Sequence, residues 1–163
     1  MIAWIETIDP EDAGPELDAA YRLARTPHGT VDNVMRAHSL RPHTMEGHLA
    51  LYRSVLHHDG NRLPLWFLEA VATYTSLVNR CEYSLTHHFD NMRRLLADEP
   101  RARRIRDALG AGRPEDAFTG KELAMMRYAG KLTAEVGSMR RADVEACRAA
   151  GADDGEILEV NQV

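Results

Sequence analysis

Residues 64–88 read PLWFLEAVATYTSLVNRCEYSLTHH, and this stretch decides how the chain folds. It begins with Pro64, which favours the first turn of a helix, and continues with a segment that is apolar on nearly all sides. The pair Asn79-Arg80 is the only local break, and asparagine tolerates the left-handed conformation that commonly ends a helix. A second helical pattern runs from Cys81 to about Leu96. The stretch therefore predicts two antiparallel helices joined by a tight turn.

This hairpin would bring several polar or reactive side chains together. Glu69 lies ten residues before Asn79 and His88 lies nine residues after it. Both are therefore roughly 15 Å from the turn, so the two side chains can face each other. Ser84 and His88 form an i, i+4 pair, and Cys81 is an i, i+3 neighbour of Ser84 in the first turn.

The predicted placement has chemical consequences. A thiolate at a helix N-terminus, as expected for Cys81, is stabilised by the helix dipole and by free N–H groups. A carboxylate beside an imidazole fixes its tautomer and raises its basicity. Glu69, His88 and position 84 thus form a plausible proton relay. Its last member is the Ser84 hydroxyl, which does not itself reduce peroxides.

The pattern Glu69-x11-Cys81-x2-Ser84-x3-His88 resembles the motif Glu-x11-Cys-x2-Cys-x3-His of the alkylhydroperoxidase D/carboxymuconolactone decarboxylase family. The segments LYRSVLHH and EILEVNQV resemble the peroxidase-related branch of that family, and the resemblance runs from about Asp32 onward. It implies an all-helical fold, homo-oligomers and thiol-based reduction of hydroperoxides. It also implies that the chain continues beyond Val163 with another helix.

The sequence departs from the family pattern at three positions. Ser84 replaces the second cysteine, which the family uses to attack the peroxide. Tyr83 stands where the best-studied members carry a relay histidine, and Arg80 stands where a glycine is common. The resemblance is therefore specific for the fold and partial for the activity.

Each candidate also has a plain structural interpretation. Cys81 could be a small buried hydrophobe, because free cysteine is often buried. Ser84 could fill the space left by a lost cysteine, and Glu69 with His88 could be a buried ion pair without a catalytic role. His87 should face solvent, because it lies about 100° around the helix from His88.

Helical signals extend over the whole chain. One stripe is expected at Leu17, Tyr21 and Ala24, and another along the helix that follows Pro42. Later helices are expected from Pro100 to Leu109, after a Thr119–Glu122 capping box, from Arg141 to Ala150, and from Asp153 onward. With no repeat or internal linker, residues 1–163 are predicted to form a single all-α alkylhydroperoxidase-like domain.

Composition excludes several classes of function. The formal charge of −5 disfavours a general role in binding nucleic acid or anionic membranes. No segment reaches the roughly 20 apolar residues that a membrane crossing needs, and the acidic start MIAWIETIDPEDAG is not a signal peptide. Two cysteines do not make a disulfide framework, so a reducing cytoplasm is the expected location.

The remaining candidates favour structural roles. Cys147 shares an apolar face with Val144 and is expected to pack in the core. The arginines between Arg93 and Arg106 alternate with acids, which indicates a solvated face. His57-His58 lies at a helix end and lacks the ligand spacing of a zinc site, so we expect no metal and no cofactor.

The leading prediction is a cytoplasmic oxidoreductase that reduces alkyl hydroperoxides. Cys81 would be the redox-active thiol, reduced again by an external thiol. Glu69 and His88 would carry protons, with Tyr83 and Ser84 as hydrogen-bonding neighbours. Two alternatives stay open: a non-redox acid–base enzyme resembling the decarboxylases of the family, and a degenerate scaffold that binds a small ligand or partner.

A homo-oligomer is also predicted from the first helix of the hairpin. Its apolar residues occupy more faces than a small monomer is expected to cover, and large exposed apolar patches usually mark interfaces. The residues concerned are Trp66, Phe67, Leu68, Val71, Leu77 and Val78.

Overall fold

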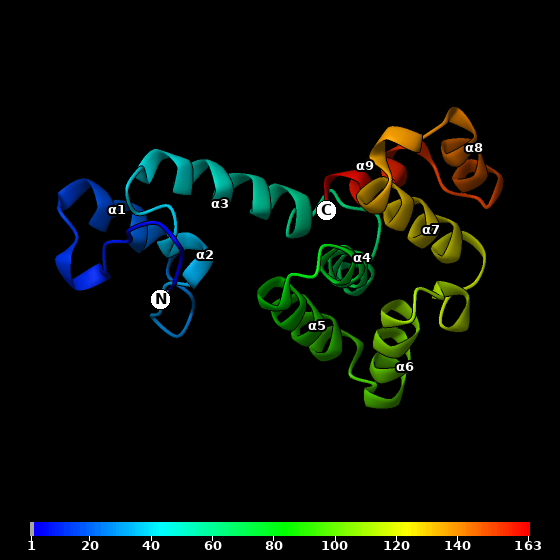
Figure 1. Ribbon diagram of the computed structural model, residues 1–163, viewed down its shortest axis with the longest axis horizontal. Helices are drawn as coiled ribbons and strands as arrows, with labels where there is room; N and C mark the ends of the chain where they lie inside the picture. The colour runs from blue at the N-terminus through cyan, green and yellow to red at the C-terminus, as the bar shows by residue number, and fades with distance from the viewer. Residues whose placement is uncertain (1) are drawn as a thin grey trace. The chain divides into compact units, whose positions relative to one another are not determined.

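The computed structural model describes residues 2–163, and within this range it is helical, with one isolated β-bridge and no β-strand (Figure 1). The predicted all-α fold is confirmed. None of the described helices is both long and apolar enough to cross a bilayer. The helices are α1 (Pro15–Ala24), α2 (Asn33–Arg36), α3 (Pro42–Leu56), α4 (Leu65–Val78), α5 (Glu82–Leu96), α6 (Glu99–Gly110), α7 (Gly120–Ala134), α8 (Arg141–Ala149) and α9 (Asp154–Gln162).

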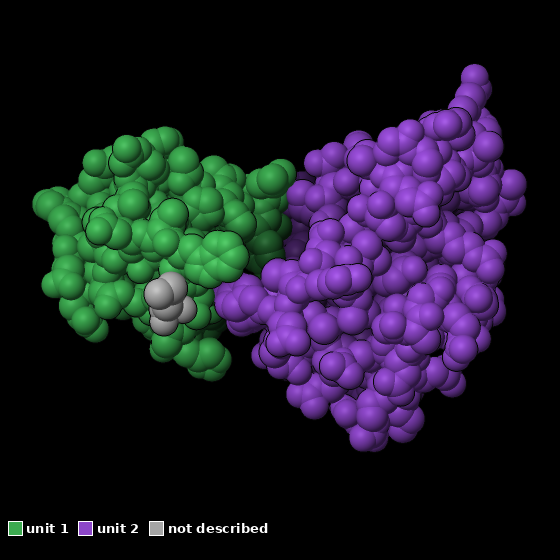
Figure 2. All heavy atoms as spheres, in the orientation of Figure 1, with its two compact units in different colours: residues 1–54 green, residues 55–163 purple. Residues whose placement is uncertain are grey.

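The chain divides into two compact units, residues 1–54 and residues 55–163 (Figure 2). The boundary falls in the last turn of α3. The hairpin of α4 and α5 lies entirely in the second unit, so this unit contains every candidate site residue. The prediction that residues 1–163 act as a single alkylhydroperoxidase-like domain stays a prediction.

The core of the first unit confirms the stripe predicted for α1. Leu17, Tyr21 and Ala24 are buried there, together with Met35 and Met45. Full burial of a large apolar side chain is worth about 1.5–3 kcal/mol. The Tyr21 hydroxyl also donates a hydrogen bond to the backbone carbonyl of Ile8, which attaches the N-terminal segment to α1.

Helix α4 is the centre of the second unit. It contacts α5, α6, α7 and α9, and Figure 1 shows it nearly end-on with α5, α6 and α7 around it. Phe67, Leu68 and Val71 are fully buried within this chain, whereas Trp66, Leu77 and Val78 are half-buried. This chain therefore covers three of the six apolar residues, and the other three keep part of their surface exposed. A homo-oligomer stays a prediction.

The turn between α4 and α5 differs from the expectation in one residue. Asn79 keeps a right-handed conformation, and the left-handed residue is Arg80, with φ of 54°. The N–H of Arg80 donates to the carbonyl of Leu77 across 3.1 Å, and that of Cys81 donates to Ser76 across 3.0 Å. These two bonds form a Schellman motif, in which a left-handed residue ends the helix. The family resemblance places a glycine at this position, and the left-handed conformation supplies the reason.

Two of the later helix starts test the predicted caps. Thr119 precedes α7 but makes no side-chain capping bond, so the predicted capping box there is wrong. The start predicted at Asp153 is confirmed by a reciprocal pair: Asp153 Oδ1 accepts from the Glu156 N–H across 2.8 Å, and Glu156 Oε2 accepts from the Asp153 N–H across 3.0 Å. Glu159 accepts from the backbone N–H groups of Arg62 (2.8 Å) and Leu63 (2.9 Å), which attaches α9 to the segment before α4.

Candidate active site

Cys81 occupies the N-cap of α5 and is exposed, so the interpretation of this residue as a buried hydrophobe is wrong. Its Sγ lies 3.3 Å from Ser84 Oγ. The pKa of the Cys81 thiol lies below its ordinary value, chiefly because the Ser84 hydroxyl and then the Ser84 backbone N–H stabilise the thiolate. Burial opposes this shift, and the Tyr83 backbone N–H adds to it. The N-terminus of α5 thus holds an accessible thiol that is activated by its own helix turn.

Glu69 and His88 meet across the hairpin, at the place that counting from the turn predicted. Glu69 Oε2 lies 2.7 Å from His88 Nδ1. The Glu69 side chain is 1% exposed and that of His88 is 22% exposed, so a carboxylate in the core reaches an imidazole close to the surface. A buried carboxylate is costly unless it is paired and hydrogen-bonded. His88 therefore supplies a partner that the position of Glu69 in α4 requires.

Asn91 is a further member of this cluster that sequence reasoning missed. Its Nδ2 donates to Glu69 Oε1 across 3.1 Å, and its Oδ1 accepts from the guanidinium of Arg94. Asn91 follows His88 by three residues, so both lie on the same face of α5. That spacing was the signal in the sequence that could have identified Asn91. A polar residue three positions after the histidine, on the face turned toward a buried carboxylate, is well placed to contact it.

The other predicted neighbours lie on a more exposed side of α5. Tyr83 is 38% exposed, and the centroid of its ring lies 4.4 Å from that of the His87 ring. The expectation that His87 faces solvent is confirmed. Tyr83 therefore contributes its backbone N–H to the thiol, while its ring packs beside His87.

Cys147 is buried in α8, as predicted from its apolar face. Its Sγ lies 3.6 Å from the backbone carbonyl of Ala124. Burial, and secondly the nearby Asp143 carboxylate, raises the pKa of the Cys147 thiol. Both cysteines are free, and their pKa values are shifted in opposite directions. Only Cys81 combines exposure with a stabilised thiolate.

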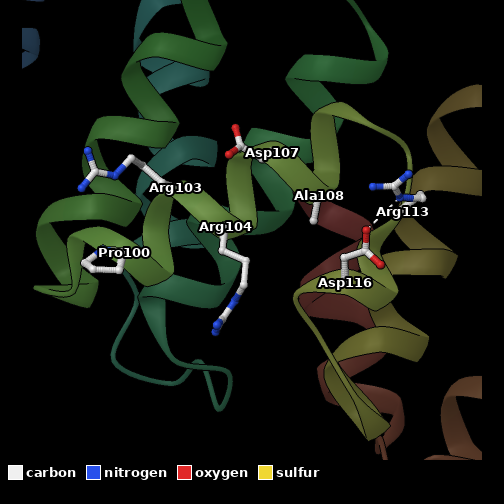
Figure 3. Close-up of a pocket in the computed structure, with 7 residues that line it drawn as sticks. All are labelled: Pro100, Arg103, Arg104, Asp107, Ala108, Arg113 and Asp116. Atoms are coloured by element: carbon white, nitrogen blue, oxygen red, sulfur yellow. Dashed lines mark hydrogen bonds and ion pairs between the residues drawn. The ribbon is translucent and has the colours of Figure 1, made fainter.

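The arginine-rich segment forms a charge-paired surface. A hollow of about 410 Å³ lies along α6 and the turn after it (Figure 3). Figure 3 shows Arg103 and Arg104 pointing away from each other, while Arg113 turns toward Asp116, with Nε and Oδ2 separated by 2.8 Å. The guanidinium groups do not converge on one point, so this surface matches the predicted solvated face.

Comparisons with known proteins agree on the architecture. No family model and no curated protein matches the sequence. Among solved structures, an uncharacterized peroxidase-related protein from Silicibacter sp. TM1040 superposes with a TM-score of 0.78 at 21% identity, covering 99% of this chain and 81% of that chain. A second structure, described as an alkylhydroperoxidase AhpD core and an uncharacterized peroxidase-related protein from Ralstonia eutropha JMP134, gives 0.81 at 20% identity, with 99% and 83% covered. The chain therefore has the all-helical fold of the alkylhydroperoxidase D core.

Proposed function

We propose that this protein reduces alkyl hydroperoxides with Cys81 as its single redox-active thiol. One observation carries the proposal. An exposed, hydrogen-bonded thiol at the start of α5 stands on the same helix as His88, which is paired with the buried Glu69. A nucleophile and a base oriented by a third group form the arrangement that activated nucleophiles share. The two similar structures from Silicibacter and Ralstonia are both described as peroxidase-related, which supports redox chemistry over other uses of the site.

The first step is attack of the Cys81 thiolate on the outer oxygen of the hydroperoxide. The S–O bond forms as the O–O bond breaks, so the sulfur is oxidised by two electrons to a sulfenic acid and the peroxide is reduced. The leaving group is an alkoxide, which needs one proton to become an alcohol. The lowered pKa of Cys81 increases the thiolate fraction available for this attack.

The proton is carried from the thiol to the leaving alkoxide by side chains of α5. Ser84 contacts Cys81 Sγ, and His88 follows Ser84 by one helical turn on the same face. In this proposal His88 takes up the thiol proton, with Glu69 stabilising the imidazolium, and then returns the proton to the alkoxide. This is general acid–base catalysis, a contribution that typically reaches about 10²–10⁴-fold.

The second half of the cycle needs an external thiol, because Ser84 cannot form a disulfide with Cys81. One thiol condenses with the sulfenic acid to give a mixed disulfide and water. A second thiol attacks that disulfide, releasing reduced Cys81 and an oxidised thiol pair. The sum is one hydroperoxide and two thiols converted into one alcohol, one disulfide and one water. The exposure of Cys81 leaves room for such a reductant to reach the sulfur.

The test is direct trapping of the sulfenic acid. Protein treated with one equivalent of an alkyl hydroperoxide should be labelled by a dimedone-type reagent at Cys81 and consume peroxide when a small thiol is supplied. Cys81→Ser should abolish both signals. Cys147→Ala is the matched control, because that thiol is buried and should leave both signals intact. Peroxide consumption that survives Cys81→Ser would contradict the proposal.

A second candidate function is acid–base catalysis without a redox step, as in the decarboxylases of the family that this sequence resembles. The observation in its favour is that the Glu69–His88 pair is complete while the dithiol is not. This activity would survive Cys81→Ser and be lost in His88→Gln. The two candidates are therefore separated by the same pair of variants, assayed with a hydroperoxide and with a carboxylated lactone.

A further inference from the structure

Asn91 contacts the relay through the Glu69 oxygen that His88 does not use. Its Nδ2 lies 3.1 Å from Glu69 Oε1, whereas His88 Nδ1 lies 2.7 Å from Glu69 Oε2. The orientation of the Asn91 amide follows from its other neighbour. A guanidinium has donors and no acceptor, so the amide oxygen must face Arg94 and the amide nitrogen must face Glu69.

This arrangement determines where the proton lies between Glu69 and His88. Glu69 accepts from Asn91 with one oxygen and meets His88 with the other. The Oε1 position faces an N–H donor, so it has no acceptor to which a carboxyl proton could be given. With Glu69 ionised, both of its oxygens accept, so His88 Nδ1 carries the shared proton and donates it to Oε2.

The protonation of Nδ1 decides what the rest of the imidazole can do. In neutral histidine one ring nitrogen donates and the other accepts, and the hydrogen bond made by the first fixes the role of the second. With Nδ1–H held by Glu69, the Nε2 of His88 is the free proton acceptor. Asn91 holds the other carboxylate oxygen of Glu69 and so keeps Glu69 facing Nδ1. In this way Asn91 influences His88 Nε2 without contacting it.

We propose that Asn91 is a positioning residue that locks the Glu69 carboxylate, and through it the Nδ1–H tautomer of His88, with Arg94 fixing the direction of the Asn91 amide. Its catalytic consequence rests on the proposed function of the Cys81 site. Its structural consequence, the tautomer of His88, does not depend on any activity. Asn91 acts through Glu69, so it is a positioning residue and not a catalytic one.

The experiment measures the His88 tautomer by ¹⁵N NMR of the imidazole ring in the resting, reduced protein. In the parent protein, neutral His88 should be in the Nδ1–H form. Asn91→Leu, which keeps the volume and removes the donor, should shift the population toward the Nε2–H form. The rate of sulfenic acid formation at Cys81 should fall about two- to tenfold, the effect of losing one hydrogen bond of about 0.5–1.5 kcal/mol.

Cys81 alkylation provides an internal comparison. The pKa of Cys81 is lowered by the Ser84 hydroxyl and by the backbone N–H groups of Ser84 and Tyr83, all in the first turn of α5. The pH profile of alkylation should therefore be the same in Asn91→Leu as in the parent. A change in the tautomer with an unchanged thiol profile is a result that general loosening of the fold would not produce.

The matched control is Thr86→Val on the same helix. The Thr86 hydroxyl donates only to the Glu82 backbone carbonyl, and the residue is exposed. This variant should leave the His88 tautomer and the oxidation rate unchanged. If Asn91→Leu unfolds, Asn91→Ala removes the same donor and introduces a strong helix former, and it should give the same tautomer shift.

The outcomes separate the two proposals. If a hydroperoxide fails to oxidise Cys81 in the parent protein, the proposed function falls, while the NMR measurement still tests Asn91. If Cys81 is oxidised but the His88 tautomer is identical in the parent protein, Asn91→Leu and Asn91→Ala, the role assigned to Asn91 is overturned.

Discussion

The backbone N–H of Cys81 donates to the carbonyl of Ser76 across 3.0 Å, so the residue that carries the thiol also closes α4. The same residue is the N-cap of α5. Helices α4 and α5 are thereby joined by a tight turn. In this turn Arg80, which lies between Asn79 and Cys81, adopts the left-handed conformation. The position of the sulfur follows from this backbone geometry, which Arg80 maintains at an energetic cost.

Arg80→Gly should therefore stabilise the protein. A left-handed conformation costs a residue with a Cβ roughly 1–2 kcal/mol, and glycine avoids most of that cost. The free energy of unfolding should rise by about 1 kcal/mol in urea denaturation. Ala97→Gly is the matched comparison, because Ala97 ends α5 with φ of 50° and should gain a similar amount. A loss of stability in Arg80→Gly would show that the arginine side chain contributes more than its backbone costs.

The buried carboxylate gives the second prediction. His88→Ala removes the ion-pair partner of the buried Glu69 carboxylate and leaves it the hydrogen bond from Asn91, and breaking a buried pair in this way costs about 3 kcal/mol. Urea unfolding at neutral pH measures this loss.

His87→Ala is the control for that experiment, since His87 is the adjacent histidine on the exposed side of α5. It should change the free energy of unfolding by less than about 0.5 kcal/mol. Equal losses in the two histidine variants would mean that the Glu69–His88 pair contributes nothing specific to the fold.

Much of this arrangement could be predicted from the sequence. The hairpin was predictable because Pro64 marks a helix start and Asn79-Arg80 interrupts two long helical patterns. The pairing of Glu69 with His88 followed from counting equal distances along antiparallel helices away from the turn. These inferences depend on local spacing, which a helix converts directly into position.

What escaped prediction depends on tertiary contacts. The three-residue spacing from His88 places Asn91 on the right face of α5, but spacing alone does not show that its amide reaches Glu69, so Asn91 was missed. The apolar faces of α4 showed that something covers this helix, but periodicity cannot tell a neighbouring helix from a partner subunit. The conformation of Arg80 was missed because asparagine, the residue before it, is the better left-handed candidate.

Ser84 gives a prediction about the thiol itself. Ser84→Ala removes the hydrogen bond that contributes most to lowering the pKa of Cys81, so the pKa should rise toward the value of about 8.5 for a free thiol. The alkylation rate of Cys81, followed by mass spectrometry against pH, should shift its midpoint upward. Ser84→Thr keeps the hydroxyl and should keep the parent profile.

The sign of the linked effect on stability can be stated. Because the pKa of Cys81 is lowered in the folded state, the thiolate stabilises the fold above the ordinary thiol pKa of about 8.5 and this contribution is lost as pH falls through the lowered pKa. The parent should therefore gain stability over Ser84→Ala as pH rises through this window. An identical alkylation midpoint in both proteins would remove the role assigned to the Ser84 hydroxyl.

The last prediction restores the missing thiol. The Cys81 sulfur already lies 3.3 Å from the Ser84 oxygen, so a sulfur in place of that oxygen needs only a small side-chain rotation to reach the bonded distance of about 2.05 Å. Ser84→Cys should form a disulfide between positions 81 and 84 on mild oxidation, detectable as a loss of two mass units. Peroxide turnover with a dithiol reductant should rise, because the resolving thiol is then supplied within the chain at high effective concentration. The Cys81→Ser/Ser84→Cys double variant is the control, since it keeps one thiol but moves it away from the N-cap, and it should show no disulfide within this motif. If the disulfide forms in Ser84→Cys while turnover stays at the parent level, the surroundings of Cys81 serve another chemistry, and the acid–base alternative gains the stronger claim to the Glu69–His88 pair.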